Sequence, residues 1–342
     1  MAFLFPAQAK VNPSFSEPDL IITYAQASGF MGTMEKSRPR VKIGNDDLWV
    51  YVNKLDIRTS AQTSQAGMNW LPSASIQAEF SSVQTYLLRN REVWDDEMMR
   101  AAGRYNVSLP NAAEEGMRQG IFQRLRSMYL YGVVAANNEG LLNTQGAVTA
   151  TLPADSYGNT TVVDYDNGDM ASYLLSEITQ LQIGMFQSGS NISNRIVVLS
   201  PQREFLNFQQ ADIVQVTSYQ RPGGGTNTVA GTMQKVLEEA GHTVEWYYDD
   251  TLIGKGAGGT DMVIVTIPEI ETPVMDRLNT NIFGALNPKS NAVNVMYNDV
   301  AAPIKIATPT PDGAIAEVLQ MRATPGWCWR PQGLLLISMP YN

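Results

Sequence analysis

Cysteine and histidine are almost missing from this chain, whose 342 residues include one of each, Cys328 and His242. A single cysteine excludes an intrachain disulfide and a thiolate metal cluster. A single histidine removes most zinc sites, and any catalytic triad would have to be built on His242, which no serine or cysteine nucleophile motif accompanies. The flanking residues Trp327 and Trp329 indicate that Cys328 is buried and inert. We therefore expect no catalytic residue, no metal ligand, no cofactor and no enzymatic activity.

The chain also lacks long apolar runs and an excess of positive charge. No stretch of 18 apolar residues is present, so no membrane span is expected, and residues 1–6 are too short and proline-broken to begin a signal peptide. Charged residues make up only 17% of the sequence, and the net charge is −9. The acidic balance argues against a nucleic-acid clamp. The small charged fraction suits a surface that neighbouring molecules cover, although many enzymes share it.

Two short motifs resemble ligand sites without matching them. The glycine-rich loop 254–260 contains a lysine, as phosphate cradles do, but Asp249 stands where the Gly-x-x-x-x-Gly-Lys motif requires its first glycine. Asp164, Asp166 and Asp169 lack the spacing of a calcium loop, and the Asn-Gly pair between them is typical of a turn before a helix. Neither motif is predicted to bind a ligand.

A long amphipathic helix is predicted over residues 111–137. Asn111 and Glu114 have capping-box spacing at its start, Gly140 is placed to end it, and Glu114 and Arg118 form an i,i+4 pair. About 26 residues at ~1.5 Å each give roughly 39 Å, which is longer than most helices of globular domains. Taken alone, such a helix also fits the core of an α+β enzyme. Its apolar stripe is Ala113, Met117, Ile121, Leu125, Met128 and Gly132, and its polar face is Glu115, Gln119, Gln123, Arg126 and Ser127.

Residues 47–80 predict a β-hairpin whose strands, 47–57 and 68–80, are joined by a polar tip. Strands of about 12 residues reach ~40 Å, yet an isolated two-stranded ribbon is only marginally stable in water. The chain offers no obvious third strand, so we expect the ribbon to lie on another copy of the protein. Residues 1–36 are predicted as an extended arm. The basic segment 36–42 either contacts phosphate or an acidic neighbour, or is a solvated loop edge.

The remaining pattern predicts an α+β chain without internal repeats or a clean linker. Strands are expected near residues 83–88, 195–199 and 261–267, and helices near 94–103 and 169–187. The last 45 residues are expected to form strands of one sheet that the earlier helices cover.

The order of these elements resembles that of tailed-bacteriophage major capsid proteins of the Hong Kong 97 fold. Residues 86–143 carry the resemblance: Trp94-Asp95-Asp96-Glu97-Met98 matches the helix before the long "spine" helix, residues 111–132 match the spine, and Gly140-Leu141-Leu142-Asn143 matches the turn after it. The family implies an N-terminal arm (1–37), an E loop (38–80) lying across a neighbouring subunit, a P domain (81–164 and 291–342, with the spine helix at 111–137) and an axial A domain (mainly 165–290). The glycine loops 223–225 and 254–259 are candidates for the loops at hexamer and pentamer centres.

The resemblance implies a structural function, in which many copies assemble into an icosahedral shell around the phage double-stranded DNA. The location is then the virion, after assembly in the host cytoplasm. Implied partners are further copies of the chain in hexamers and pentamers, a portal and non-specifically packaged DNA. Because the arm is short, a separate scaffolding protein is implied, or none, and a decoration protein is left open. An encapsulin-like nanocompartment and, less favoured, an α/β enzyme are the alternatives. The residues predicted to contact neighbouring subunits are Lys36, Arg38, Arg40, Lys42, Trp49, Tyr51, Lys54, Arg58 and Trp70.

Overall fold

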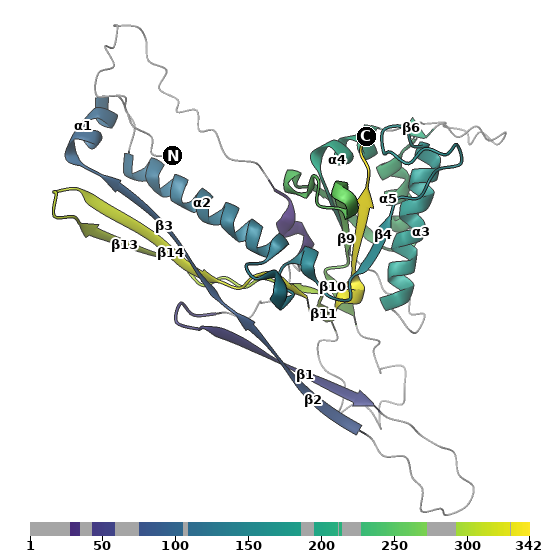
Figure 1. Ribbon diagram of the computed structural model, residues 1–342, viewed down its shortest axis with the longest axis horizontal. Helices are drawn as coiled ribbons and strands as arrows, with labels where there is room; N and C mark the ends of the chain where they lie inside the picture. Colours follow the sequence, from purple (N-terminus) through teal and green to yellow (C-terminus); the bar gives the residue numbers. More distant parts are fainter. Residues whose placement is uncertain are drawn as a thin grey trace, which may run out of the picture.

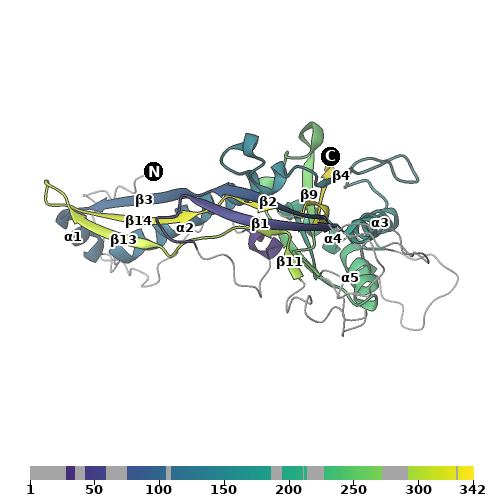
Figure 2. The same cartoon turned by 90° about the horizontal axis from the view of Figure 1, so that it is seen from below.

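The computed structural model describes residues 28–34, 43–58, 75–104, 109–185, 195–210, 212–213, 227–271, 292–328 and 330–342. Figure 1 shows three parts: a body built on a five-stranded sheet, an elongated limb in which helix α2 (Leu109–Tyr131) lies along a three-stranded sheet, and a two-stranded ribbon. The ribbon consists of β1 (Trp49–Arg58) and β2 (Ser75–Gln84). In Figures 1 and 2, β2 runs on into the limb strand β3 (Tyr86–Trp94) in nearly one line.

The body sheet has the strand order β4-β16-β9-β5-β8. These strands are β4 (Val148–Thr151), β16 (Leu334–Met339), β9 (Asp261–Thr266), β5 (Arg195–Ser200) and β8 (Thr243–Tyr248). β16 is parallel to β4 and β5 is parallel to β8, whereas β9 is antiparallel to both of its neighbours. The three central strands are buried along almost their whole length, as apolar strands covered on both faces should be.

Different elements cover the two faces of the body sheet. Because side chains alternate along a strand, Val263 and Val265 of β9 pack with Leu174 and other residues of the helices α3 (Asn167–Met185), α4 (Gln202–Gln210) and α5 (Val229–Glu239). Ile264 points the other way and packs with Tyr129 at the end of α2 and with the 3₁₀ turn η1 (Phe30–Thr33). The body sheet therefore binds the limb helix and the N-terminal segment on one face.

The limb sheet is antiparallel, with the order β13-β14-β3, and consists of β13 (Ile304–Pro309), β14 (Ile315–Ala323) and β3. Met117 and Ile121 of α2 pack on Leu88 and Leu319 of the sheet. The short helix α1 (Asp96–Arg104) lies at the outer end of the limb (Figure 1). The smaller elements are the strand pairs β6–β7 (Asp212–Ile213, Asn227–Thr228), β10–β11 (Glu269–Glu271, Ala292–Asn294) and β12–β15 (Met296–Tyr297, Trp327–Cys328), and the 3₁₀ turns η2 (Ala135–Asn137), η3 (Leu141–Asn143), η4 (Asp250–Leu252), η5 (Ala257–Gly259) and η7 (Pro331–Gly333).

The predicted long helix is present, but both of its predicted ends were wrong. It begins at Leu109 because Pro110 fits the first turn, where its missing N–H costs nothing. Asn111 and Glu114 are therefore inside the helix, and Glu114 pairs with Arg118 (2.6 Å), as predicted, and with Lys305 (2.8 Å). The helix ends at Tyr131 because Gly132 takes a positive φ of 71°.

The assignment of Arg126 to the polar face of the helix was also wrong, because this residue is buried. The last turns of α2 are enclosed on two sides, by Met128 contacting the limb sheet and by Tyr129 and Leu130 contacting the body. Of the predicted stripe, Met117, Ile121 and Met128 are buried as expected.

The late strands do not form one sheet, in contrast to the prediction. β13 and β14 belong to the limb, whereas β16 lies in the centre of the body sheet beside β9, where it pairs with β4. The body sheet thus unites strands from the segments expected to form the P domain (81–164 and 291–342) with strands from the expected A domain. Hydrophobic runs can be recognised locally, but which sheet receives them depends on long-range pairing. Among the described residues, no helix is long and apolar enough to cross a membrane.

Candidate assembly surface

The ribbon is a regular hairpin with no third strand among the described residues. Its antiparallel register runs from the pair Trp49↔Gln84 to the pair Arg58↔Ser75. The second strand is described over Ser75–Gln84, and residues 68–74 of the predicted strand lie outside the described residues. Its end, predicted at residue 80, was wrong, because the strand continues to Gln84, into the region expected to form a separate strand at 83–88. Ten residues per strand give a reach of ~33 Å at ~3.3 Å per residue. A ribbon of this length with one partner strand leaves both of its edges unpaired.

Hydrogen bonds at the base of the ribbon set its direction. Thr85 separates β2 from β3, and its N–H donates to Leu48 O (3.1 Å) while its hydroxyl donates to Asp47 O (2.5 Å). Arg322 of β14 donates from Nη1 to Thr85 Oγ1 (3.0 Å) and from Nε to Asn45 O (2.8 Å). Through Arg322, the limb sheet thereby binds the residues next to both strands of the ribbon, Asn45 before β1 and Thr85 after β2.

Large side chains are exposed where the ribbon begins. Val50 is buried against Ile43 and Ala301, and alternation turns its neighbours outward. Trp49 is 47% exposed and Tyr51 71% exposed in the single chain. Aromatic residues exposed in this way are enriched in protein–protein interfaces.

The structure places some of the predicted contact residues and not others. Trp49 and Tyr51 lie together on the ribbon, as described above. Lys54 and Arg58 are in β1, where the backbone is described and the side chains are not. Lys36, Arg38, Arg40, Lys42 and Trp70 lie outside the described residues. Contact of any of these residues with a neighbouring subunit stays a prediction.

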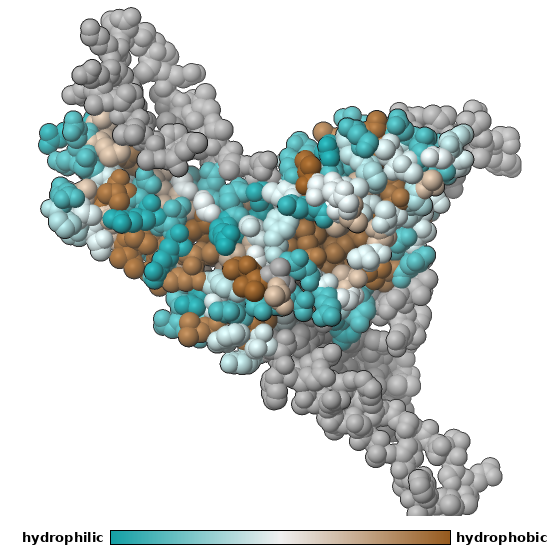
Figure 3. Space-filling model, in the orientation of Figure 1, coloured by the Kyte–Doolittle hydropathy of each residue, from teal (hydrophilic) through white to brown (hydrophobic). Residues whose placement is uncertain are grey.

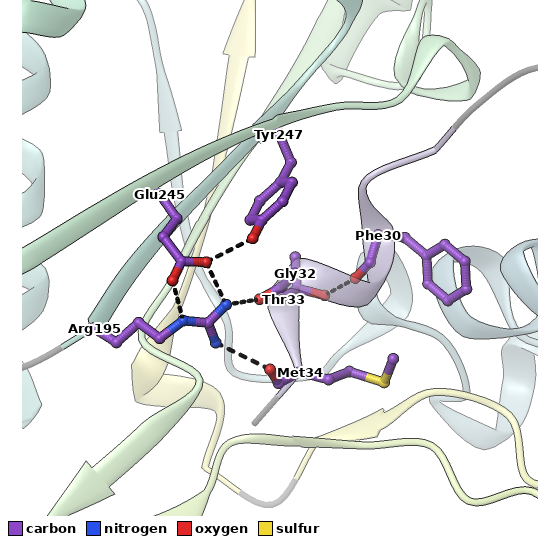
Figure 4. A network of polar contacts seen from close by, with 7 residues as sticks. All are labelled: Phe30, Gly32, Thr33, Met34, Arg195, Glu245 and Tyr247. Atoms are coloured by element: carbon purple, nitrogen blue, oxygen red, sulfur yellow. Dashed lines mark hydrogen bonds and ion pairs between the residues drawn. The ribbon is translucent and has the colours of Figure 1, made fainter. Parts of the chain in front are cut away.

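Sequence reasoning missed a polar network that attaches residues 28–34 to the body (Figure 4). The guanidinium of Arg195 donates to both carboxylate oxygens of Glu245, at 3.0 and 2.7 Å. It also donates to the carbonyl oxygens of Gly32 (2.8 Å) and Met34 (3.1 Å). Burial would lower the pKa of Arg195, but Glu245 outweighs burial and holds it above its ordinary value. One half-buried cation thus attaches the N-terminal segment to β5 and β8.

Packing complements this network. A Cβ atom on Gly32 would lie 2.3 Å from the Tyr247 ring, so the close approach of η1 to β8 requires glycine at this position. On its other side, Phe30 contacts the rings of Phe122 and Tyr129 with centroid separations of 5.5 and 5.4 Å. The N-terminal segment therefore fills the space between the body sheet and α2. The prediction of an extended arm over residues 1–36 was wrong for residues 28–34, which pack on their own chain; residues 1–27 lie outside the described residues.

A second network, at the end of α2, was also missed. The buried carboxylate of Glu139 accepts hydrogen bonds from Val134 N (2.9 Å), Val133 N (3.2 Å) and the Tyr86 hydroxyl (3.0 Å). Burial and the Glu139 carboxylate raise the pKa of Tyr86 to about 12. Asn143, from the predicted Gly-Leu-Leu-Asn turn, donates to Tyr131 O at 2.7 Å. This turn joins the limb to the body, which gives a physical reason for its sequence.

The motifs that were not predicted to bind ligands are accounted for by local structure. Burial raises the pKa of the Cys328 thiol to about 12, which makes it a poor nucleophile. Burial lowers the pKa of His242. Asp166 accepts from Gly168 N (2.9 Å) and Asp169 N (3.0 Å), which confirms the predicted turn before a helix. Within the described ranges, no three His, Cys, Asp or Glu residues are grouped so that they could hold a metal ion.

Comparison with known proteins identifies the fold through structure and not through sequence. No protein-family model matches the chain, and no curated protein matches it. The capsid of Myoviridae phage XM1 superposes with a TM-score of 0.61 at 12% identity, covering 95% of this chain and 96% of that one. The capsid of a native GTA particle gives 0.58 at 8% identity (97% and 96% covered), and that of cyanophage P-SCSP1u gives 0.56 at 11% (97% and 93% covered).

These likenesses extend over almost the whole length of both chains in each pair. They show that the chain has the α+β, Hong Kong 97-like fold of phage capsid proteins, as predicted from its sequence.

Proposed function

We propose that the chain is a major capsid protein of a tailed bacteriophage, and that many copies assemble through hexamers and pentamers into an icosahedral shell around double-stranded DNA. The observation that carries the proposal is the likeness to capsid chains over 95% of this chain. The two-stranded ribbon supports it. Within the described part of the chain the ribbon has exposed aromatic residues and no third strand, so it gains a buried face when a neighbour lies beside it.

The parts of the structure take the roles that the family implies. The ribbon is the E loop, the limb with α2 is the P domain and its spine, and the body is the A domain, to which β4 and β16 also belong. Each copy offers a ribbon and a body edge, so each contributes several modest contacts that closure of the shell multiplies. With a net charge of −9, the shell encloses DNA and does not grip it.

The partners beyond further copies of this chain follow from the same proposal. They are a portal, a separate scaffolding protein and non-specifically packaged DNA, with assembly in the host cytoplasm and the virion as final location. Size-exclusion chromatography and electron microscopy of the purified chain test the proposal, with closed particles as the expected result. Nucleic acid inside particles from infected cells distinguishes a virion shell from a nanocompartment filled with cargo protein.

Removing most of the ribbon should abolish closed particles without unfolding the subunit. Joining Val52 to Ser81, which are paired in the register, through Asn-Gly deletes residues 53–80 and keeps the base of the hairpin. The contacts of Thr85 and Arg322 are untouched, so we expect a folded, soluble chain that elutes as small species. The milder deletion of residues 58–67 should act in the same direction. Normal particles from the joined variant, seen by electron microscopy, would show that the ribbon is dispensable.

Replacing both exposed aromatic residues should weaken assembly more than stability. Trp49→Ser with Tyr51→Ser removes side chains that contribute little to the isolated chain because they are exposed there. We expect the concentration needed for particle formation to rise by about tenfold or more, which corresponds to a loss of ~1.4 kcal/mol in the free energy of association for each ribbon contact with a neighbour. The Tm of the isolated chain should change by at most a few degrees. Val236→Ser on α5, also exposed at 47%, is the matched control. Equal effects in the control and the double variant would argue against a specific role for the ribbon aromatics.

A further inference from the structure

Two carboxyl groups are buried side by side where α4 meets β9. Glu204 is in the first turn of α4 and is 0% exposed, and Asp261 is the first residue of β9 and is 1% exposed. Neither residue was singled out by the sequence, and the proposed shell function does not use them.

The two carboxyl groups differ in the number of hydrogen-bond donors around them. Asp261 accepts from Arg203 Nε (2.6 Å), Arg203 Nη2 (2.7 Å) and Gly254 N (3.1 Å). No N–H or hydroxyl donor from the described residues reaches either Glu204 oxygen. The side-chain partner of Glu204 is the Asp261 carboxylate. Two carboxyl groups can form a hydrogen bond only when one of them holds a proton, and the donors around Asp261 leave that proton on Glu204.

The surrounding charges agree with this assignment. Burial, followed by Asp261, raises the pKa of Glu204 to about 8, while Arg203 acts in the opposite direction. Burial would raise the pKa of Asp261 as well, but Arg203 and the Gly254 N–H hold it below its usual range. Arg203 also lies over the Tyr341 ring, 4.3 Å from its centroid. One arginine thus faces two carboxyl groups, and it neutralises only one of them.

The same pair holds an exposed loop. Asp261 binds the loop between β8 and β9 through Gly254 N, and Asp250 at the start of that loop accepts from Gln202 N of α4 at 2.9 Å. Farther along, Ala257 N donates to Ser338 Oγ at 2.9 Å.

The start of the loop is anchored by Leu252, which is buried in the core, and by the Tyr131 hydroxyl, which donates to Thr251 O. Residues 253–260 follow it and are mostly exposed, and Gly254 N–Asp261 is one of their contacts with the body. A second negative charge at Glu204 would repel the buried Asp261 carboxylate that makes this contact.

We propose that residues 253–260 of this loop form a pH-sensitive element, held closed while Glu204 and Asp261 share a proton and loosened when that proton is lost. This inference does not depend on the proposed function, because it concerns the packing within one chain. In a closed shell, loosening of this loop would weaken the contacts that the loop makes with neighbouring subunits.

The sign of the pH dependence follows from proton linkage. Opening of residues 253–260 withdraws the Gly254 N–H from Asp261 and admits solvent to the carboxyl pair, which returns the pKa of Glu204 toward its ordinary value near 4.5. The closed form therefore binds more protons between that value and about 8. Closure is therefore strongest below about pH 4.5, weakens as the pH rises toward 8, and changes little above it.

Hydrogen–deuterium exchange of the full chain tests the proposal. After correction for intrinsic exchange rates, the opening constant of residues 253–260 should rise roughly ten- to a hundredfold between pH 6 and pH 8, while helix α5 stays unchanged. Glu204→Gln, which can donate to Asp261 at any pH, should remove this dependence, and Glu239→Gln on the exposed end of α5 should retain it. A flat profile in the wild type, or equal slopes in the wild type and Glu204→Gln, would overturn the proposal.

A measurement on the wild type keeps the test independent of variant folding. In protein labelled with ¹³C at glutamate side chains, one carboxyl resonance should titrate with a midpoint above pH 7. Glutamate resonances that all titrate near pH 4 to 5 would overturn the proposal.

Discussion

Replacing Gly140 by alanine is expected to lower the free energy of unfolding by about 3–5 kcal/mol. Gly140 has φ 90° and ψ 149°, a conformation available almost exclusively to glycine. A Cβ atom there would lie 2.3 Å from Gly132 N and 2.4 Å from Tyr131 C, which are backbone atoms that cannot turn away. Backbone strain of about 1–3 kcal/mol and overpacking of about 1–3 kcal/mol act together at this one position. Urea unfolding of the unassembled chain measures the loss.

The matched control for Gly140 is Gly116→Ala in the same long helix. Gly116 is exposed inside α2, and a Cβ atom there meets nothing within 4 Å. Alanine should stabilise the helix by roughly 0.5–1 kcal/mol because it has the higher helix propensity. Opposite signs at the two glycines are the expected pattern. A similar small effect at both would mean that the close contact of residues 132 and 140 does not hold the end of α2.

Arg195→Met is expected to cost about 2–4 kcal/mol and to release residues 28–34 from the body. The substitution keeps most of the aliphatic length but leaves Glu245 without its cation and the carbonyls of Gly32 and Met34 without their donors. Removing one partner of a buried ion pair costs about 3–5 kcal/mol, and the partial exposure of this pair, 21% and 31% for the two side chains, reduces that figure. Hydrogen exchange should rise in residues 28–34 in the same variant.

Two companions of Arg195→Met separate its mechanism from a general loss of charge. Arg100→Met removes an ion pair to Asp96 whose side chains are 80% and 78% exposed, so it should change stability by at most ~0.5 kcal/mol. Adding Glu245→Leu to Arg195→Met removes the unpaired carboxylate and should recover part of the loss. Arg195→Met with unchanged exchange at residues 28–34 would contradict the role given to this network.

Local patterns were sufficient for the elements that have a strong period. The long helix was predicted from the four-residue spacing of Met117, Ile121 and Leu125. The ribbon was predicted from β-rich runs on either side of a polar tip. The predicted C-terminal end of the helix was wrong because Gly132 and Gly140 can both take the left-handed conformation that ends a helix. Only the fold shows that Gly132 ends the helix and that Gly140 serves the contact with it.

The attachments between parts could not be predicted from the sequence, for a physical reason. Arg195 binds Gly32, which is 163 positions away, and Arg322 binds Asn45 and Thr85, at separations of 277 and 237. A single arginine carries no local signal of such a partner. Glu204 had no signal either, since its position in an amphipathic helix suggests a solvated carboxylate until the burial of its face is known.

The central claim is that the ribbon of β1 and β2 packs on another copy of the chain. A cryo-electron microscopy reconstruction of particles formed by the full chain tests this most directly. We predict a closed icosahedral shell in which strands β1 and β2 of each copy, with Trp49 and Tyr51, pack on a different copy. A reconstruction in which these strands touch only their own chain, or a chain that stays monomeric at assembly concentrations, would contradict it.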